Sequence, residues 1–174
     1  MWPVMDRQVA AGRVVVMEIG PDRLDDLHDL WLALHRHHMR IGSWPLVCDE
    51  AAAWVLRRAQ YEEWLRAGDG IVLMAERAGR PAGYAAVHLQ RGPDDTFPLG
   101  DRWAEIYSLS VAPDARGEGI GGQLLDAIDE RLAALGIVDV VVAAMVENED
   151  ALRWYQRRGF VPREVVLYRF GEQP

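Results

Sequence analysis

Residues 111–122 read VAPDARGEGIGG and stand between a strand-like run at 104–111 and a helix-like run at 119–135. Where a glycine-rich turn opens a helix, the first backbone N–H groups of that helix have no partner and the helix dipole adds positive charge. Glycines lack the β-carbon that would keep phosphate oxygens at a distance, and Arg116 adds a formal cation. The stretch therefore predicts a turn that binds pyrophosphate without a lysine.

The same glycines permit two other interpretations. Gly117, Gly119 and Gly122 have the G-x-G-x-x-G spacing of a dinucleotide-binding turn, and a tight strand–helix turn can also be glycine-rich without binding any ligand. A dinucleotide turn is expected after the first strand of a doubly wound sheet, whereas this turn lies past the midpoint of the chain. Its place in the chain argues against a dehydrogenase.

The remaining pattern predicts a mixed α/β domain with one sheet covered by helices. Alternation, apolar periodicity and the placement of glycine and proline indicate the boundaries. Strands are expected at 13–19, 71–76, 82–89, 104–111, 138–145 and 165–170, and helices at about 22–41, 49–67, 119–135 and 148–158. The run at 138–145 is apolar and mostly β-branched, which predicts a strand buried on both faces.

Two motifs resemble those of one enzyme family. Arg116, Gly119 and Gly121 follow the strand AEIYSLSV at 104–111, and this arrangement resembles the acyl-CoA motif of the GCN5-related N-acetyltransferase (GNAT) superfamily. Residues 148–160, with the pattern N-x-x-A-x-x-x-Y-x-x-x-G-F, resemble the second signature of the same family. The resemblance implies a central mixed sheet of six to seven strands, flanked by about four helices, with the fourth and fifth strands splayed apart around acetyl-CoA.

The resemblance also implies a single domain over residues 1–174, with an N-terminal extension at 1–12 and an acetyl-CoA-binding core at 104–160. Backbone groups of the strand end would pair with the pantetheine arm, amides of the turn would hold the pyrophosphate, and Asn148 would contact the arm from the neighbouring strand. The implied acetyl-CoA-binding residues are Leu109, Ser110, Val111, Arg116, Gly117, Glu118, Gly119, Ile120, Gly121, Gly122, Asn148, Ala151 and Tyr155.

By the same resemblance, Tyr155 would lie near the thioester sulfur and protonate the CoA thiolate as it leaves. The residues are compatible with that role, because Ala151 and Tyr155 are four apart on one helix face and alanine leaves room beside the phenol. A thiol has a pKa of about 8.5, so the thiolate needs only modest help from an acid. Taken alone, Tyr155 is better explained as an aromatic residue that packs its helix on the sheet.

Glu105 is the candidate base that takes a proton from the acceptor ammonium. It lies eleven residues before Arg116, a spacing at which some members of the family carry a catalytic glutamate. Partial burial of a carboxylate at a strand end would raise its pKa toward neutrality. The alternative is a solvated charge at Glu105, with ordered water as the base. Strand alternation divides the run between two faces, with Glu105, Tyr107, Leu109 and Val111 on one and Ile106, Ser108 and Ser110 on the other.

Other reactive side chains do not predict a second site. Cys48 has no accompanying histidine and aspartate, so direct acetyl transfer in a ternary complex is expected in place of an acyl-cysteine. His35, His37 and His38 lack the spacing of zinc ligands, and no metal site is expected. Four tryptophans lie in a region that usually shapes the acceptor pocket of the family, and core packing is the default interpretation for each. They are Trp31, Trp44, Trp54 and Trp64.

The 174 residues carry a formal charge of −8, one cysteine and 19 basic residues, all of them arginine. The absence of lysine excludes Walker-type phosphate loops, protein kinases and Schiff-base enzymes. An acidic chain is not expected to bind nucleic acid or an anionic membrane. A single cysteine and the lack of an apolar leader favour a cytoplasmic protein. A homodimer is expected only by analogy with the family.

Acidic residues supply the hint about the acceptor. An acidic rim would attract a cationic amine, so an aminoglycoside-like or polyamine-like small molecule is the leading hypothesis. A protein N-terminal amine or a lysine is the second acceptor class. A non-catalytic acyl-CoA-binding sensor is the alternative from a different functional class. The acids of the expected rim are Asp94, Asp95 and Asp101 before the Glu105 strand, and Glu147, Glu149 and Asp150 around Asn148.

Overall fold

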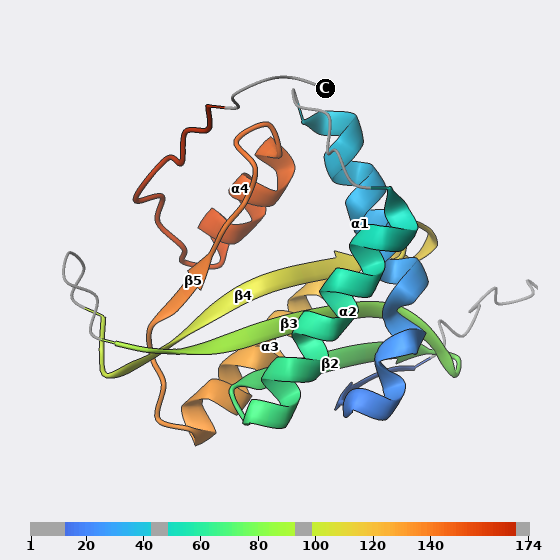
Figure 1. Cartoon of the computed structure of the whole chain (residues 1–174), viewed down its shortest axis with the longest axis horizontal. Helices are drawn as coiled ribbons and strands as arrows, with labels where there is room; N and C mark the ends of the chain where they lie inside the picture. The colour runs from blue at the N-terminus through green and yellow to red at the C-terminus, as the bar shows by residue number, and fades with distance from the viewer. Residues whose placement is uncertain (1–12, 43–48, 93–98, 170–174) are drawn as a thin grey trace, which may run out of the picture. The chain divides into compact units, whose positions relative to one another are not determined.

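The computed structural model describes residues 13–42, 49–92 and 99–169. The chain forms two compact units, residues 1–143 and 144–174. In the first unit, the sheet has the order β1-β2-β3-β4-β5, with antiparallel pairing from β1 to β4 and parallel pairing of β4 with β5 (Figure 1). The strands are β1 Val14–Glu18, β2 Gly70–Arg77, β3 Arg80–Arg91, β4 Arg102–Val111 and β5 Val140–Val142. This arrangement confirms the predicted mixed α/β class.

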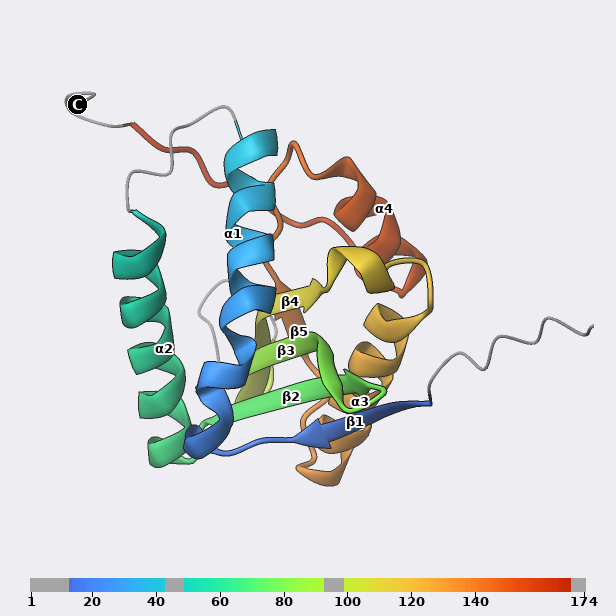
Figure 2. The same ribbon diagram turned by 90° about the vertical axis from the view of Figure 1, so that its right-hand side faces the viewer.

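Helices cover both faces of that sheet (Figure 2). In the first unit they are the 3₁₀ helices η1 Pro21–Leu27 and η2 Pro113–Ala115 and the α-helices α1 His28–Ile41, α2 Glu50–Ala67 and α3 Ile120–Ala134. α1 and α2 pack on one face. α3 packs on the other, where Ile120 and Leu124 leave no free space for a β-carbon at Gly83 of β3. The second unit contains α4 Glu149–Arg157.

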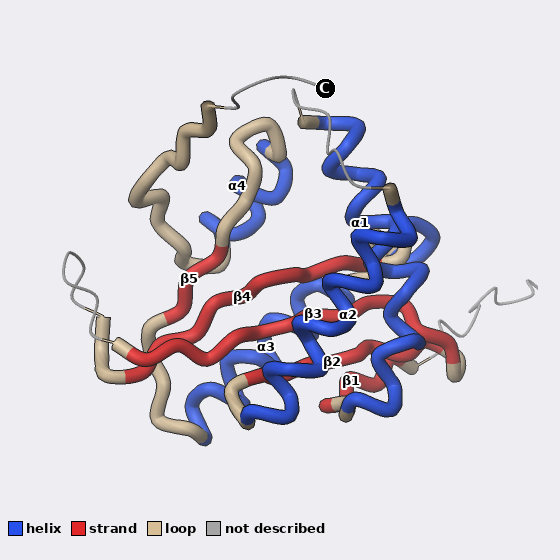
Figure 3. Tube along the Cα trace, viewed as in Figure 1, coloured by secondary structure: helices blue, strands red, loops and turns tan. Residues whose placement is uncertain are grey.

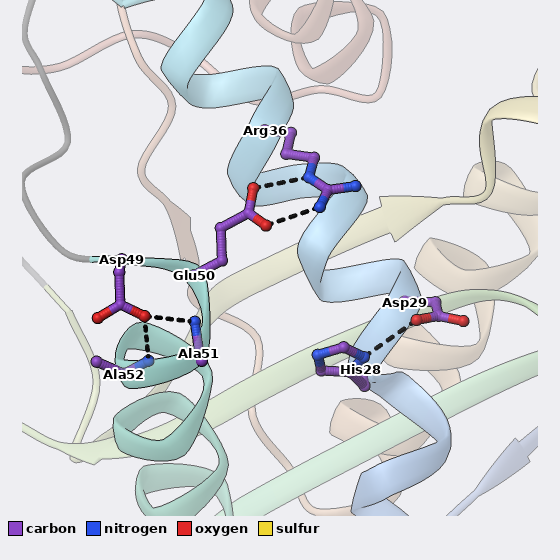
Figure 4. Close-up of polar contacts among 7 residues, drawn as sticks. All are labelled: His28, Asp29, Arg36, Asp49, Glu50, Ala51 and Ala52. Atoms are coloured by element: carbon purple, nitrogen blue, oxygen red, sulfur yellow. Dashed lines mark hydrogen bonds and ion pairs between the residues drawn. The ribbon is translucent and has the colours of Figure 1, made fainter.

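The start of α2 is stabilised by two side chains. The Asp49 carboxylate accepts hydrogen bonds from the backbone N–H groups of Ala51 and Ala52, both at 3.0 Å, and so caps the first turn (Figure 4). The next residue, Glu50, accepts two hydrogen bonds of 2.7 Å from the guanidinium of Arg36. This bidentate pair ties the start of α2 to α1, and so helps to set the position of the face that α2 presents to the sheet.

The core on the α1 and α2 side of the sheet is rich in aromatic rings. Trp31 and Trp54 are both buried, with ring centres 5.5 Å apart, and Tyr61 is fully buried. Their burial supports packing as the role of these two tryptophans. On the opposite side, α3 covers the sheet with apolar side chains that are at most 1% exposed, Ile120, Leu124, Leu125, Ile128 and Leu132.

β4 contains one residue more than the segment of β3 beside it. Val87 is paired with Ile106 and its neighbour Ala86 with Ser108, so Tyr107 has no partner on β3. Such a β-bulge bends the strand and re-aims its side chains. Residues directly opposite each other in an antiparallel pair lie on the same face of the sheet. The bulge therefore reverses, beyond Tyr107, which residues of β4 lie on each face.

The last two predicted strands differ from the structure. β5 spans only Val140–Val142 and Val141 is 37% exposed, so the prediction of a doubly buried strand at 138–145 is wrong in length and in burial. Residues 165–169 form no strand, and the segment after α4 is loop (Figure 3). β-branched residues form a strand only where another strand pairs with them, and the sheet ends at β5. The described sheet therefore has five strands where six to seven were expected.

Candidate active site

In the sheet of the described residues, no strand pairs with one edge of the C-terminal half of β4. Its ladder with β5 covers three residue pairs and stops at Ile106. Just past the end of β4, Ala112 donates its N–H to the carbonyl of Ala82 in β3 at 2.9 Å. Backbone groups alternate between the two edges along a strand, so Leu109 and Val111 direct theirs away from β3. This is the edge on which the predicted pairing with a pantetheine arm depends.

The turn between β4 and α3 exposes backbone N–H groups. Gly117 and Gly119 both have φ of 81°, which favours glycine, and Gly119 caps α3 without a side-chain hydrogen bond. Gln123 donates to the carbonyl of Gly119, so the N–H groups of Ile120 to Gly122 have no acceptor inside the helix. A β-carbon at Gly117, Gly119 or Gly122 would meet nothing within 4 Å. The turn therefore has the shape that the sequence predicts and is open to a ligand.

An ion-pair bridge holds this turn to the sheet. Arg77, at the end of β2, binds the carboxylate of Asp114 at 2.9 Å and also pairs with Glu118. The Glu118 side chain is therefore directed at Arg77. Arg116 is exposed, and its Nε lies 3.4 Å from the carbonyl of Val111. The terminal nitrogens of Arg116 can therefore face an anion.

Glu105 lies on the face of β4 that α1 and α2 cover. Its partner on β3 is His88, whose ring stacks on Trp64 of α2 with centroids 4.2 Å apart. Residues opposite each other in an antiparallel pair point to the same side of the sheet, so Glu105 shares the face of His88. Glu105 is half-buried there. The candidate base thus lies on the side of the sheet where the aromatic core begins.

Ser108 and Ser110 lie on the same face as Glu105, which corrects the predicted alternation. The Tyr61 hydroxyl donates to Ser108 Oγ at 2.7 Å, and Ser110 Oγ donates to a backbone carbonyl of α1 at 2.9 Å. Regular alternation places both serines opposite Glu105, but the bulge at Tyr107 adds one residue to the count and reverses the faces beyond it. The Ser110 hydroxyl is therefore used in packing α1 on the sheet.

Arg57 of α2 is a functional candidate that the sequence analysis missed. Its Nη1 donates to Ser108 Oγ at 3.2 Å, and its guanidinium carbon lies 4.5 Å from the centre of the Tyr107 ring. A cation near an aromatic face is attracted by the ring quadrupole. The signal in the sequence is the spacing of Arg57, Tyr61 and Trp64, which places the three residues on one side of a helix.

The second unit contains the other predicted site residues. Asn148 caps α4, where its Oδ1 accepts a hydrogen bond from the N–H of Ala151 at 3.3 Å, and its Nδ2 remains to donate. Tyr155 lies one turn beyond Ala151, and its ring contacts those of Trp154 and Phe160 edge-on. Burial raises the pKa of the Tyr155 phenol to about 12. The phenol is therefore a neutral hydrogen-bond donor throughout the neutral pH range.

The structure places the predicted site residues in two sets. The turn at 116–122, the free edge of β4 and Glu105 belong to the first unit. Asn148, Ala151 and Tyr155 belong to the second. The turn and the cap of α4 are held by local hydrogen bonds, whereas Glu105 and the edge of β4 are positioned by the pairing of β4 with β3.

The acids expected to form a rim are partly compensated. Glu149 and Asp150 both bind Arg153, one turn along α4, at 2.9 and 2.7 Å. Asp94 and Asp95 lie outside the described residues. The observed ion pairs therefore reduce the negative charge that the start of α4 offers to a cationic acceptor.

Several expectations concern metals, membranes and the remaining side chains. Within 13–42, 49–92 and 99–169, no group of three His, Cys, Asp or Glu side chains could hold a metal ion, and no helix is long and apolar enough to cross a membrane. His35 stacks on Trp31 with centroids 4.9 Å apart. Cys48 and Trp44 lie outside the described residues.

Comparison with known proteins adds a family to this geometry. Residues 26–160 match the model of the acetyltransferase (GNAT) family, which is more than half of the chain and includes both the turn before α3 and α4. The chain belongs to the GNAT family. The sequence resemblance carried by the two motifs is thereby confirmed.

This GNAT chain has relatives with named activities. It is 33% identical over 148 residues to the mycothiol acetyltransferase of Thermobispora bispora, a match that covers 81% of the chain and 45% of the relative. It is 33% identical over 105 residues to an L-methionine sulfoximine/L-methionine sulfone acetyltransferase of Pseudomonas aeruginosa, covering 60% of the chain and 58% of the relative. The chain thus spans less than half the length of the first relative and less than two thirds of the second.

A solved structure of an aminoglycoside N-acetyltransferase in complex with CoA shares the GNAT fold. The two structures match with a TM-score of 0.72 at 16% identity, over 94% of this chain and 98% of the other. At that level of identity the likeness concerns the fold. It confirms the expected GNAT architecture around β4 and α3.

Proposed function

We propose that this GNAT chain transfers the acetyl group of acetyl-CoA to a primary amine of a small molecule, by direct attack in a ternary complex. The observation that carries the proposal is the open turn at 117–122, with unpaired N–H groups and space for phosphate oxygens. The free edge of β4 at Leu109 and Val111 adds peptide groups for the amide-containing pantetheine arm. The two features fit two chemically different parts of one CoA molecule.

Three residues are proposed to complete the acetyl-CoA site. Asn148 would donate from Nδ2 to the pantetheine arm, because its Oδ1 is occupied by the helix cap. Ala151 precedes Tyr155 by one turn of α4 and leaves space for the thioester beside the phenol. Arg116 would supply the formal positive charge that complements the phosphates.

Glu105 is proposed as the base. Its carboxylate, directly or through a water molecule, would take a proton from the acceptor ammonium and free the nitrogen lone pair. The nitrogen would then attack the acetyl carbonyl carbon, so that a C–N bond forms as the C–S bond breaks. The acylated nitrogen would then release its second proton to solvent, which leaves a neutral amide. The proton on Glu105 would also pass to solvent, and the CoA thiolate would take one proton from solvent once it has left.

Tyr155 is proposed to stabilise the leaving sulfur. Its pKa of about 12 lies above the value of about 8.5 for a thiol, so full proton transfer from the phenol to the thiolate is unfavourable. A hydrogen bond from the neutral phenol stabilises the charge that develops on sulfur without that transfer. In this proposal, a hydrogen bond to sulfur replaces the proton donation expected for Tyr155 from the family resemblance.

The acceptor is proposed to be a small primary amine. The fold neighbour is named for aminoglycosides and one sequence relative for L-methionine sulfoximine, an amino-acid derivative, so a primary amine is the common element. A polycationic acceptor is supported by Asp101 and Glu105, whereas Glu149 and Asp150 are compensated by Arg153. Protein amines are the second acceptor class to be tested.

Binding and turnover can be measured separately. Titration calorimetry with acetyl-CoA, CoA and NADH tests the turn, and thiol release with a panel of small amines and peptides tests transfer. Binding of acetyl-CoA together with thiol release supports the proposal. Binding without release from any amine identifies an acyl-CoA sensor, and binding of NADH without CoA contradicts the proposal.

Two variants test the assigned roles. Tyr155→Phe should lower the turnover number by roughly 100-fold, the scale of a lost hydrogen bond to a developing charge, and change the dissociation constant of acetyl-CoA much less. Tyr168→Phe, at a residue 72% exposed, is the matched control. Glu105→Gln should slow transfer most at acidic pH, where the acceptor is most fully protonated, and Glu63→Gln on the exposed side of α2 is its control. An unchanged rate in Glu105→Gln would assign the proton to water.

A further inference from the structure

Arg57 differs from the other half-buried arginines of the described chain. Its polar contact is the neutral hydroxyl of Ser108, at 3.2 Å, and no carboxylate of the described residues lies within ion-pair distance of it. A partly buried cation without a counter-ion costs folding free energy. Each of the other half-buried arginines pairs with at least one carboxylate, namely Arg23, Arg58, Arg77 and Arg131.

The guanidinium of Arg57 has N–H hydrogen-bond donors that its contacts leave unused. The ring centres of Tyr107 and Tyr61, at 4.5 and 5.8 Å, attract the cation without accepting conventional hydrogen bonds from its N–H groups. A guanidinium has five N–H donors in one plane, and Ser108 accepts from one nitrogen. The remaining donors suit a carboxylate or a phosphate, which can each accept two parallel hydrogen bonds from one arginine.

Imidazole side chains of α1 also lie on this side of the sheet. Burial lowers the pKa of His38, and the charges of His37, His35 and Arg57 lower it further, which shows that these groups lie within electrostatic range of His38. The Nε2 atom of His35 is buried without a hydrogen-bond partner among the described residues. The cation with unused donors at this place is Arg57, and an anion is the chemistry that it complements.

Arg57 also lies near the place where the acetyl group would be transferred. Tyr107, which the guanidinium contacts, is the bulge residue two positions after Glu105 and two before Leu109. Ser108 and Glu105 face the same side of β4, and three residues of strand span roughly 10 Å. The interval between Ser108 and Glu105 leaves room for one hydrogen bond of about 3 Å at each end. A short acceptor molecule fits between these two bonds.

We propose that Arg57 binds an anionic group of the acceptor, a carboxylate or a phosphate, close to the amine that is acetylated. The acceptor is then an amino-acid-like molecule, in contrast to a polyamine or another polycation. This inference rests on the proposed function, because Glu105 and the acetyl-CoA edge of β4 define where the amine must lie.

The test compares acceptors that differ in one group. An amino acid, its carboxamide, an aminoalkyl phosphate and a polyamine are each offered to the full chain with saturating acetyl-CoA, and thiol release is followed. We expect kcat/KM for the amino acid or the aminoalkyl phosphate to exceed that for the carboxamide at least roughly tenfold, as a charge-assisted hydrogen bond supplies. The better of these two acceptors identifies the anionic group as carboxylate or phosphate.

Variants then assign the preference to Arg57. Arg57→Gln should abolish the difference between the acid and its carboxamide and leave the dissociation constant of acetyl-CoA unchanged. Arg66→Gln removes an arginine from the same helix, one that is 70% exposed and paired with Glu62, and should keep the preference. If circular dichroism shows that Arg57→Gln does not fold, Arg57→Lys keeps the charge but loses the planar fork, and should show a reduced preference.

Two results would overturn the inference. One is equal or faster transfer to the carboxamide or the polyamine by the unaltered chain, and the other is a preference for the acid that survives in the folded Arg57 variant. Both leave acetyl-CoA-dependent thiol release, and with it the proposed function, intact. Absence of thiol release with every amine contradicts the proposed function itself, and the inference falls with it.

Discussion

The turn between β4 and α3 and the face of β4 beneath α1 and α2 offer a ligand different chemistry. The turn presents backbone N–H groups, its two acidic side chains are bound to Arg77, and its shape depends on glycines with φ of 81°. The face presents side chains, namely Arg57 of α2 and Glu105 of β4, which lie on the same side of the sheet. A backbone site depends on the absence of β-carbons, whereas a side-chain site depends on the contacts that hold each residue.

This difference predicts that stability and ligand binding respond in opposite ways in the two regions. Adding a methyl group to the turn should damage binding without harming the fold. Removing a buried polar atom from the face should harm the fold without affecting binding of acetyl-CoA. If one of the following substitutions changed stability and acetyl-CoA affinity in parallel, the proposed difference between the turn and the face would be wrong.

The largest effect is expected from Gly122→Ala in the first turn of α3. The new β-carbon meets nothing within 4 Å and leans toward the helix N-terminus, where phosphate would bind, so affinity for CoA should fall about tenfold. The same change should raise helix stability by up to about 1 kcal/mol, because alanine favours a helix over glycine. Calorimetry and thermal melting measure the two quantities. Ala127→Gly, further along α3, is the inverse control and should lower stability alone.

A smaller effect is expected from Tyr61→Phe on the other side of the comparison. The Tyr61 hydroxyl donates to Ser108 Oγ at 2.7 Å inside the core, so its loss should lower the free energy of unfolding by about 1 kcal/mol. Denaturant titration measures that change. The affinity for acetyl-CoA should stay the same, and a parallel loss of affinity would show that the face and the turn do not act independently.

The smallest effect is a pH dependence of stability at His38. Burial lowers the pKa of this imidazole below its usual value of 6.5, so the folded state takes up a proton less readily than the unfolded chain. The contribution of His38 is therefore fully present above pH 6.5 and is lost as the pH falls below that value. Between pH 7.5 and 5.5, His38→Gln should show a smaller decrease in melting temperature than the unaltered chain. His28→Gln, the same change at a side chain 45% exposed, gives the baseline.

The turn could be predicted from the sequence because its structure is local. The conformations of Gly117 and Gly119 are ones that glycine adopts most readily, and the apolar spacing that starts at Ile120 marks the helix directly behind them. The N-terminal cap of α4 could be predicted for the same reason, because Asn148 and Ala151 form their hydrogen bond within one turn. The order of strands and helices up to β4 is predicted correctly for the same reason.

The face of β4 could not be predicted because it depends on residues that are distant in the chain. The bulge at Tyr107 is a property of the pairing of β4 with β3. No residue in the run 104–111 indicates it. Arg57 and Ser108 are 51 residues apart in sequence and meet only once α2 has packed on the sheet. The expected strand at 165–170 fails for a related reason, since its β-branched residues lack a pairing partner in the described sheet.

The bridge that Arg77 makes to the turn has a consequence for the effect of salt. Asp114 and Glu118 are bound to Arg77, and with Arg116 these two acids and two arginines carry no net formal charge. A phosphate at the turn would then be held by hydrogen bonds far shorter than the Debye length of about 8 Å. Long-range electrostatic attraction should therefore contribute little to its arrival, and ionic strength should act on its affinity mainly through the exposed Arg116.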